Sequence, residues 1–337
     1  MRTKFISGAP SCRVKMPYMV IPFYFILSLL FISPATAADL PGIPLFIDEM
    51  VAKHQFKRAE LVQVLQRAQY QQAVIDAISK PATTKPWPEY RGVFINDKRI
   101  NGGVKFWSQY ETALKLAEKQ YGVPQEIIVA VIGVETLYGR NSGKFSTLDA
   151  LTTLAFAYPP RTGFFRSELE NFLLLARDQE WELFKVQGSY AGALGIPQFM
   201  PSSYLRHAVD FDNDDVTDLL DDPLDAIGSV ANYLRKYGWQ RGQPVAVRVS
   251  VSEKACVGST SVASNLADWA EVGIVPVTPV TDGGLALLLD FTVAEGKEFW
   301  LAFNNFQVIT LYNNSIFYAM SVYQLAEAIR TARARQE

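Results

Sequence analysis

The sequence predicts an α+β protein that is predominantly α-helical and has a small β region near its C-terminus. Apolar residues recur at three- and four-residue spacing through most of the chain to about residue 240, which is the period of a helix with one buried face. After Gly242 the pattern changes to alternating and β-branched segments, which are typical of strands. The 337 residues, 49% of them hydrophobic and 20% charged, can form a core without disulfides or a metal.

The net charge and the counts of cysteine and histidine argue against several classes of function. The 32 Lys and Arg against 34 Asp and Glu give a net charge of −2, which does not support a nucleic-acid binder. The chain has two cysteines, Cys12 and Cys256, and two histidines, His54 and His207. A zinc cluster of Cys and His therefore lacks ligands. Catalysis by a nucleophile and a histidine would have to use one of these two histidines.

The first 37 residues have the pattern of an export signal. A basic segment precedes an apolar run at 18–32, and Ala35-Thr36-Ala37 offers small residues at the −3 and −1 positions of a cleavage site. The run contains Pro22 and is shorter than the ~20 residues of a membrane-spanning helix, although an uncleaved anchor is the alternative. No cysteine follows the run, so lipid attachment has no acceptor there. We expect a soluble exported protein in which Cys256 has no disulfide partner.

The first part of the exported chain is expected to be helical on both sides of a loop. Residues 44–80 predict short helices with apolar residues three and four apart. Residues 81–103 are rich in Pro, Gly and Asn and predict a loop. A helix with an aromatic face is expected from Phe106 to Tyr121, ending before Gly122.

Start and stop signals predict four further helices. Pro124 stands in the favoured first turn of the next helix, and Gly139 ends it. The capping-box patterns at 146–149 (Ser-x-x-Asp) and 167–170 (Ser-x-x-Glu) place helix starts at about 147 and 168. Asp222-Pro223 starts the last of this group, which Gly238 ends.

Strand signals appear in residues 243–312. The segment PVAVRVSV alternates apolar and polar residues, and the segments LALLLDFTV and FQVITLY are rich in β-branched and aromatic residues. Gly283-Gly284, directly before LALLLDFTV, marks a turn. A final helix is expected after Asn313-Asn314, running to about Ala334.

These elements divide the chain into five segments. They are a signal peptide (1–37), an N-terminal helical region with a loop (38–104), a helical core (105–242) that contains an Asp-rich loop (210–222), a β-rich region (243–312) and a C-terminal helix that packs back on the helical part (313–337).

Glu135 is the catalytic candidate that the residues themselves suggest. It interrupts a helix that is otherwise apolar on every side from Ile127 to Tyr138, and such a helix is buried. Burial and the negative end of the helix dipole both raise the pKa of a carboxyl group, and an acid still protonated near neutral pH is what general acid catalysis requires. The alternative is a structural Glu paired with Arg140 or the backbone.

Gly133 lies in the middle of the same helix, two residues before Glu135. A glycine in mid-helix costs ~1 kcal/mol of stability relative to alanine, which indicates that another group packs closely against the helix at this position.

The segment from Gly188 to Tyr204 is a glycine-punctuated loop with hydroxyl, amide and aromatic groups. Such groups suit a neutral, polyhydroxylated ligand such as a sugar, and the alternative is an ordinary connection between helices. No Asp or Glu occurs between Glu182 and Asp210. Ordinary glycoside hydrolysis uses two carboxylates. If this loop faces Glu135, the second partner must be a hydroxyl or N-acetyl group of the substrate itself.

Residues 210–225 contain eight aspartates, spaced as in a calcium-binding loop. Asp215 stands where the loop pattern has Gly, so it must adopt a left-handed conformation or distort the loop. The twelfth position holds Asp instead of the longer Glu. Weak binding of a structural calcium ion is one interpretation, and a solvated loop with Asp222 capping a helix is the other. The candidate ligands are Asp210, Asp212, Asp214, the carbonyl of Val216, Asp218, and Asp221 or Asp222.

Four motifs, in the same order, resemble the lytic murein transglycosylase B family. They are ETLYG at 135–139, QFMPSSY at 198–204, DAIGSVANY at 225–233, and YNNS with YAM at 312–320. The likeness extends from about Pro44 to the last helix. It implies a lysozyme-like catalytic core with added α and β regions, in a periplasmic enzyme. It also implies a loop similar to an EF-hand at the Asp cluster.

The resemblance further implies cleavage of the β-1,4 bond between N-acetylmuramic acid and N-acetylglucosamine in peptidoglycan, with a 1,6-anhydro product. In this reading Glu135 acts as general acid and then as base, and Ser189 orients its carboxylate. Residues that match groups lining the sugar cleft are Tyr90, Gln198, Tyr233, Tyr312 and Tyr318. Tyr233 and Tyr312 have a core position as their alternative, because one is at the edge of a helical stripe and the other ends a predicted strand.

The expected partners are peptidoglycan strands and, as a further candidate, enzymes of cell-wall synthesis, with a monomeric protein and no required cofactor. Two other functions remain open at this point. One is a muramidase that uses water, with Asp149 or Glu170 as its second carboxylate. The other is a non-catalytic protein that binds the cell wall.

Overall fold

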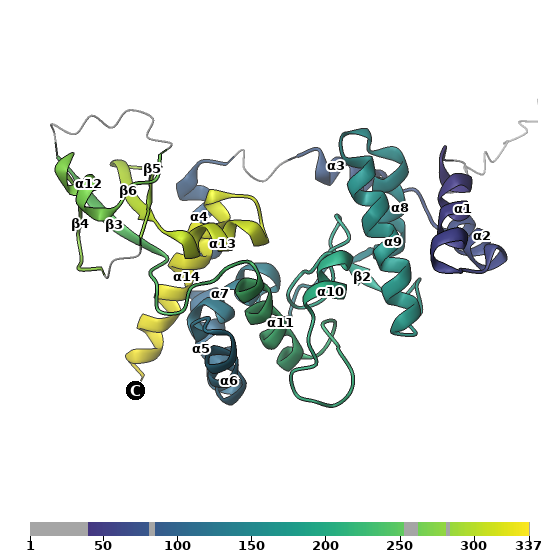
Figure 1. Cartoon of the computed structure of the whole chain (residues 1–337), viewed down its shortest axis with the longest axis horizontal. Coiled ribbons are helices and arrows are strands. Elements are labelled where there is room, and N and C mark those ends of the chain that lie inside the picture. Colours follow the sequence, from purple (N-terminus) through teal and green to yellow (C-terminus); the bar gives the residue numbers. More distant parts are fainter. Residues whose placement is uncertain (1–39, 81–84, 253–261, 281–283, 337) are drawn as a thin grey trace, which may run out of the picture. The chain divides into compact units, whose positions relative to one another are not determined.

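The structure, a computed structural model, describes residues 40–80, 85–252, 262–280 and 284–336 (Figure 1). The predicted signal peptide, both cysteines and Gly283 lie outside the described residues. Among the residues that are described, no helix is long and apolar enough to cross a membrane. Helices dominate and the sheets are few and small, so the predicted α+β, mainly helical class is confirmed.

The N-terminal region is built from the expected short helices. They are α1 (Ile43–His54), α2 (Arg58–Arg67) and α3 (Gln72–Ile78). Helix α1 contacts α2, and α3 contacts α8 (Thr147–Ala157), so these helices pack against the middle of the chain.

The loop predicted over 81–103 is wrong for most of its length. Helix α4 (Trp87–Phe94) starts with a proline in its first turn, where a missing N–H costs nothing. Helix α5 (Asp97–Gln109) starts after Asn96, whose side chain accepts a hydrogen bond from the backbone N–H of Arg99. The helix expected from 106 to 121 is therefore two helices, α5 and α6 (Glu111–Tyr121). The residues that suggested a loop have other tasks here. Proline and Asn96 start helices, and Gly102 and Gly103 allow Tyr138 and Ile329 to pack close to α5.

The helices of the middle region follow the predicted caps with one exception. Helix α7 (Gln125–Thr136), helix α8 after Ser146, and α11 (Pro223–Lys236) after Asp222 start as expected. The start predicted at 168 is wrong, because α9 (Thr162–Asp178) begins earlier, after a 3₁₀ turn. Its glutamate, Glu170, contacts His54 on α1 instead of capping the helix. A short helix, α10 (Pro201–His207), completes this region.

The β region forms a four-stranded antiparallel sheet with strand order β4-β3-β6-β5. The strands are β3 (Ala246–Val251), β4 (Ile274–Pro276), β5 (Leu287–Val293) and β6 (Gly296–Ala302), and α12 (Leu266–Glu271) precedes β4. A second, two-stranded sheet joins β1 (Phe145–Ser146) to β2 (Gln187–Gly188).

The strand predicted for FQVITLY is also wrong, because this segment lies in α13 (Asn304–Tyr312). Phe306 and Ile309, three residues apart, are buried on one face of the helix. The β-branched residues favour a strand locally, but packing against the final helix, α14 (Ile316–Ala334), decides the outcome. Strand β6, which the sequence did not reveal, occupies the place next to β5.

Helix α14 packs against four other helices. It contacts α7, α5, α4 and α13, and most of its residues from Tyr318 to Ile329 are buried. Figure 1 shows this helix beside α7, although the two are separated by most of the sequence. The arrangement brings the side chains of α14 to the end of α7 that carries Glu135.

Candidate active site

Glu135 lies in the last turn of α7, after a run of buried residues from Ile127 to Val134. Its side chain keeps partial access to the surface. Burial raises the pKa of Glu135 to about 7, and a hydrogen bond from Tyr318 offsets part of this rise. The raised pKa that the sequence led us to expect is therefore found, and desolvation is its main cause.

Tyr318, on α14, holds one oxygen of that carboxyl group. Its phenol donates a hydrogen bond of 2.6 Å to Oε1 of Glu135. The Tyr318 side chain is buried, and burial together with the charge of Glu135 keeps the pKa of the phenol well above its usual value. Tyr318 therefore acts as a neutral donor.

A strained turn fixes the end of α7 directly after Glu135. Leu137 and Tyr138 have φ angles of 53° and 64°, which are left-handed values that cost non-glycine residues about 1–2 kcal/mol each. Two hydrogen bonds of Thr136 hold this turn: its Oγ1 donates to the carbonyl of Ile196 at 2.8 Å and accepts from the N–H of Gly139 at 3.0 Å. The loop expected to face Glu135 is thus tied to the end of its helix.

Gly133 leaves room for the ring of Tyr138. A Cβ atom at position 133 would lie 2.5 Å from the hydroxyl oxygen of Tyr138, closer than any real contact. That hydroxyl donates a 2.7 Å hydrogen bond to the carbonyl of Arg99 on α5. The close approach inferred from the mid-helix glycine is confirmed, and the approaching group is a residue of the same motif as Glu135.

Ser189 and Gln198, the two polar site residues predicted in this loop, make hydrogen bonds to backbone groups in and next to the loop. Ser189 Oγ accepts from the N–H groups of Ala191 and Ala193 at 3.3 and 3.0 Å, and among the described residues it has no hydrogen bond with Glu135. Gln198 adopts a left-handed conformation with φ of 52°. Its Nε2 donates to the carbonyls of Ser142 and Gly195 at 2.8 and 2.9 Å, which leaves Oε1 for a ligand.

The predicted tyrosines form one aromatic cluster beside this loop. Tyr312 and Tyr318 are stacked with ring centroids 6.4 Å apart, and Tyr233 packs on Tyr312 at 4.8 Å. The Tyr233 hydroxyl donates a hydrogen bond to the backbone carbonyl of Leu311, and the Tyr312 hydroxyl donates one to the backbone carbonyl of Pro197. Both hydroxyls therefore stabilise the fold, in line with the core interpretation. Tyr312 ends helix α13, not a strand as predicted.

Tyr90 reaches the same site from α4. It is largely buried and packs against Phe317, which precedes Tyr318 on the chain. Burial raises the pKa of the Tyr90 phenol, and the charge of Glu135 adds to the rise. A role of Tyr90 in binding sugar stays a prediction.

The two other carboxylates that the sequence offered for catalysis, Asp149 and Glu170, have partners of their own. Asp149 accepts a 2.9 Å hydrogen bond from the N–H of Gln69, and Glu170 lies 2.6 Å from His54. Burial and Tyr318 are the causes of the pKa shift of Glu135, with no contribution from a second carboxylate. Among the described residues, the Glu135 carboxyl can therefore supply one proton and take one back without a second carboxylate beside it.

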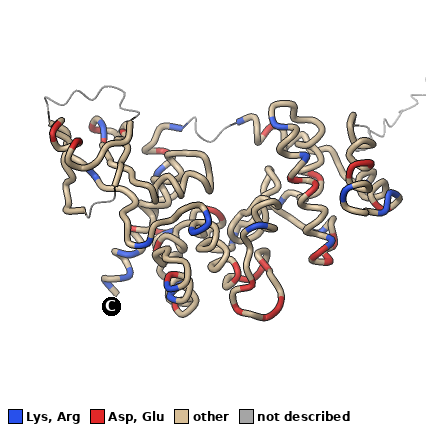
Figure 2. The backbone as a smooth tube through the Cα atoms, viewed as in Figure 1, with Lys and Arg blue, Asp and Glu red and all other residues tan. Residues whose placement is uncertain are grey.

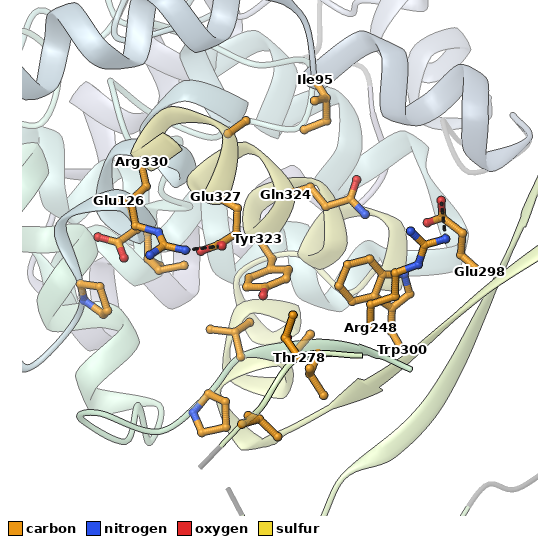
Figure 3. A pocket seen from close by; sticks show the side chains of 18 of the residues that line it. Ile95, Glu126, Arg248, Thr278, Glu298, Trp300, Tyr323, Gln324, Glu327 and Arg330 are labelled. Atoms are coloured by element: carbon orange, nitrogen blue, oxygen red, sulfur yellow. Dashed lines mark hydrogen bonds and ion pairs between the residues drawn. The ribbon is translucent and has the colours of Figure 1, made fainter. Parts of the chain in front are cut away.

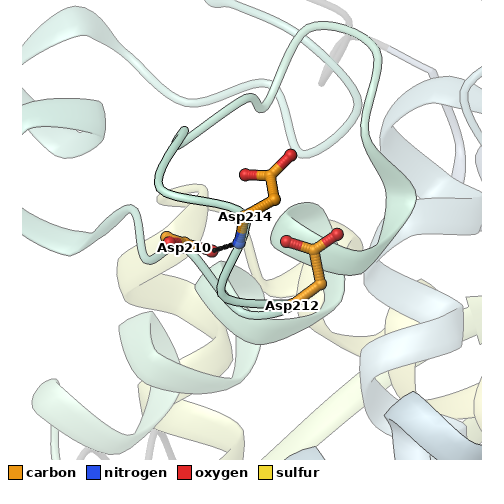
Figure 4. Close-up of side chains that lie close together, drawn as sticks. All are labelled: Asp210, Asp212 and Asp214. Atoms are coloured by element: carbon orange, nitrogen blue, oxygen red, sulfur yellow. Dashed lines mark hydrogen bonds between the residues drawn. The ribbon is translucent and has the colours of Figure 1, made fainter.

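The Asp-rich loop, drawn in Figure 2 as a run of acidic backbone between α10 and α11, gathers two sets of carboxylates. In the first set, Asp210, Asp212 and Asp214 have ligand atoms within 4.8 Å of one another (Figure 4). The second set is Asp212 with Asp222 and Asp225. Of the two residues left open for the twelfth position, Asp222 belongs to the second set and also caps α11, whereas Asp221 belongs to neither set. Asp218, also predicted as a ligand, belongs to neither set.

Backbone hydrogen bonds shape this loop. Asp210 accepts from the N–H groups of Asn213, Asp214 and Asp215, and Asp215 has the left-handed φ of 70° expected for the turn position. Asp225 is not among the ligands that the sequence predicted. It is buried, and its carboxylate accepts hydrogen bonds of 2.7 Å from the backbone N–H groups of Phe211 and Asp218, on the two sides of the loop. The one feature of the sequence that could have pointed to Asp225 is that it is the first residue of the DAIGSVANY motif.

Comparison with known proteins gives a consistent set of relatives. A family model described as "Transglycosylase SLT domain" matches residues 42–327. The membrane-bound lytic murein transglycosylase B of Escherichia coli (strain K12) is 43% identical over 308 residues, which cover 88% of this chain and 85% of that protein.

Solved structures of two proteins extend the comparison. The E. coli lytic transglycosylase Slt35, solved with bulgecin A and with calcium, aligns with a TM-score of 0.83 at 42% identity, covering 94% of this chain and 100% of that chain. SltB3 from Pseudomonas aeruginosa, solved with NAG-NAM-pentapeptide and with NAG-anhNAM-pentapeptide, aligns with a TM-score of 0.77 at 28% identity, covering 86% of this chain and 78% of that chain.

Proposed function

The chain belongs to the transglycosylase SLT family, and from this we propose that it is a peptidoglycan lytic transglycosylase in which Glu135 is the single acid–base catalyst. The resemblance in the four sequence motifs is confirmed by these relatives. The bond cleaved in this proposal is the β-1,4 link between N-acetylmuramic acid and N-acetylglucosamine. The relative solved with an anhydro-sugar ligand supports the proposed product.

In the first step the protonated carboxyl of Glu135 donates its proton to the glycosidic oxygen. The bond between C1 of the muramoyl residue and that oxygen breaks, and the N-acetylglucosamine end leaves as an alcohol. The pKa of about 7 keeps a large fraction of Glu135 protonated near neutral pH, so the acid is available for this step.

In the second step the carboxylate that remains removes the proton from the muramoyl C6 hydroxyl. The C6 oxygen then bonds to C1 and closes a 1,6-anhydro ring, so no water is consumed and Glu135 is protonated again. Between the two steps the carbonyl oxygen of the substrate's own N-acetyl group bonds to C1 in this scheme. That bond breaks when the C6 oxygen bonds to C1, which restores the neutral N-acetyl group.

The observation that carries the proposal is the isolation of Glu135 from other carboxylates. A muramidase that uses water needs a second carboxylate at the bond. The two candidates for that role, Asp149 and Glu170, hold Gln69 and His54 instead. Tyr318 fixes the orientation of the Glu135 carboxyl, a task that the family motif had suggested for Ser189.

Ser189, Gln198, Tyr233 and Tyr312 support the same site in different ways. The free Oε1 of Gln198 is the group we assign to a sugar hydroxyl or amide N–H. Ser189, Tyr233 and Tyr312 hold the loop and the aromatic cluster in shape through backbone contacts. A cavity of about 450 Å³ beside Phe317, between α13 and α14, gives space for part of a glycan strand.

The test is the mass of the products from purified sacculi. We expect muropeptides with anhydro ends, lighter by one water than those with reducing ends, and no release by Glu135→Gln. Glu182→Gln, which changes an exposed carboxylate paired with Lys185, is the control and should act as the parent does. Reducing ends from the parent enzyme would exclude the transglycosylase reaction.

A calcium ion in the Asp-rich loop is a second proposal. The donor set fits a hard cation, because carboxylate oxygens are ligands that Ca²⁺ prefers, and the two sets adjoin through Asp212. The residues that would hold the ion are Asp210, Asp212, Asp214, Asp222 and Asp225, and the ion would stabilise the loop without entering the reaction. The relative Slt35 has been solved with calcium.

Calcium should raise the melting temperature of the parent protein, and Asp212→Asn should reduce this rise. Asp76→Asn, on α3, removes a similar charge outside the loop and serves as the control. An equal calcium response in all three proteins would contradict the proposed ligands.

Export to the periplasm and cleavage near Ala37 follow from the signal pattern of the first 37 residues. N-terminal sequencing of the mature protein tests this part. We also propose that the protein acts as a monomer, which light scattering would check.

A further inference from the structure

A second cavity, of about 700 Å³, lies between the β region and the helices (Figure 3). Its lining comes from β3 and β6, from the start of α7, from α4 and from the second half of α14. Glu126 in this lining lies nine residues before Glu135 on α7, which is about 13 Å along a helix axis. The cavity is therefore separate from the catalytic carboxyl.

The two ends of the cavity carry opposite net charges. At one end, Glu126 and Glu327 face one cation, Arg330, which pairs with Glu327 at 2.5 Å (Figure 3). Two carboxylates against one guanidinium leave a formal charge of −1. This end can therefore attract an ammonium group.

The other end has the opposite balance. Arg91 and Arg248 lie there with one acid, Glu298, which is 3.9 Å from Arg248. Arg91 and Glu298 also line an adjoining cavity of about 420 Å³, so the basic end continues beyond the first cavity. Two guanidinium groups against one carboxylate leave a formal charge of +1, which can attract a carboxylate.

Several donors at the basic end are not used by the described residues of the protein. Trp300, which pairs with Arg248 across β3 and β6, has a buried Nε1 without a hydrogen-bond partner. Trp87 is 2% exposed and lines the adjoining cavity, and its Nε1 is also buried without a hydrogen-bond partner. Arg91 donates through Nε to Oε1 of Gln324 at 2.7 Å, and its two terminal nitrogens have no hydrogen bond to another described residue. A buried unpaired donor destabilises the protein, and an acceptor on a ligand would offset this cost.

From the opposite charges at the two ends and the unused indole donors, we infer that this cavity binds a zwitterionic peptide. The carboxylate lies at Arg91 and Arg248, the ammonium at Glu126, and the middle of the peptide over Tyr323. A neutral sugar would gain nothing from the separated charges, and a simple polyanion would be repelled by the acidic end.

The source we assign is the peptide attached to peptidoglycan strands, which carries free carboxylates and a free amino group. To this extent the inference rests on the proposed function. A relative solved with a glycan that bears a pentapeptide is consistent with a substrate of this kind.

The first experiment is calorimetric titration of the full-length mature protein with the free tripeptide L-Ala-γ-D-Glu-meso-diaminopimelate. Binding should be measurable with the parent and at least tenfold weaker in Arg248→Gln and in Glu126→Gln. Arg335→Gln and Glu271→Gln, which change exposed charges outside the cavity, should bind as the parent does. Melting curves verify that each variant is folded. No binding by the parent, or equal binding by all variants, would overturn the inference.

The second experiment compares glycan strands with their peptides against strands stripped by an amidase. The two cavity variants should show a raised KM on strands with peptides and an unchanged KM on stripped strands. If the parent cleaves neither substrate, the proposed function fails while the titration still reports on the cavity. If the variants lose affinity for a tetramer of N-acetylglucosamine and not for the tripeptide, the cavity is a glycan subsite and the peptide assignment is wrong.

Discussion

Tyr318 donates a 2.6 Å hydrogen bond to Glu135 across a separation of 183 residues in the chain. Burial of Glu135 raises its pKa and the bond from Tyr318 lowers it, so the value of about 7 is the balance of the two. The bond also leaves the second carboxyl oxygen without a partner among the described residues, and this oxygen is the one free to carry the proton. Helix α14 thus sets both the acidity and the orientation of the proposed catalyst.

The first prediction concerns the pH dependence of turnover. Because the first step needs the protonated form of Glu135, turnover should fall as the pH rises through about 7. Tyr318→Phe removes the bond that lowers the pKa, so the falling limb should move to higher pH. Tyr312→Phe leaves that bond intact and should keep the limb in place. Turnover measured from pH 5 to 9 checks this, and a shift of the limb to lower pH in Tyr318→Phe would falsify the assignment.

The second prediction concerns stability. The pKa of Glu135 is about 7 in the folded state and near 4.5 when unfolded, so the folded protein binds the proton more tightly and loses stability as the pH rises from 4.5 to 7. At pH 8 this loss is about 3 kcal/mol. Glu135→Gln lacks the ionisation and should therefore be more stable than the parent at pH 8, with the difference shrinking toward pH 4.5.

Denaturant unfolding at the two pH values measures this difference. Glu182→Gln is the control, because its exposed carboxylate should give no gain of this size at pH 8. A Glu135→Gln variant that is less stable than the parent at pH 8 would show that the charged carboxylate is well solvated or paired.

The third prediction concerns Gly133. In Gly133→Ala the added methyl group would meet the Tyr138 hydroxyl at 2.5 Å, so the ring must move and its bond to Arg99 is lost. We expect destabilisation of about 2–3 kcal/mol and a lower kcat, because Tyr138 belongs to the turn that follows Glu135. Gly163→Ala on α9, where nothing lies within 4 Å of the new carbon, should be neutral or slightly stabilising. Equal stability of the two variants by thermal melting would contradict the packing argument.

The fourth prediction concerns the link between α7 and the loop. Thr136→Val keeps the shape of the buried side chain but removes its hydrogen bonds to Ile196 and Gly139. We expect a loss of about 1–3 kcal/mol in unfolding free energy together with slower turnover. Thr152→Val is a close control, because that hydroxyl is equally buried and has no hydrogen-bond partner in the described structure. Replacing it should not destabilise the protein, and a similar loss in both variants would show that the bonds of Thr136 contribute little.

Much of the helical fold could be predicted because its signals are local. Ser146 and Asp222 cap helices through bonds to residues two or three positions away, so the sequence alone shows them. The errors arose where local preference and tertiary packing disagree. Residues 306–312 prefer a strand by composition but form part of α13, because packing on α14 buries one helical face. Trp87-Pro88 looked like loop but begins α4.

The sequence by itself determined that Glu135 is sheltered and that the loop beside it has no acid, because both follow from residues close together in the chain. Only the tertiary structure decided that Tyr318, and not Ser189, holds the carboxyl, and that Asp222 rather than Asp221 lies beside Asp212 and Asp225. The same holds for the cavity that joins Arg248 to Glu126. These contacts depend on how distant helices and strands pack, and the spacing of residues along one element does not encode which atoms of another element it will meet.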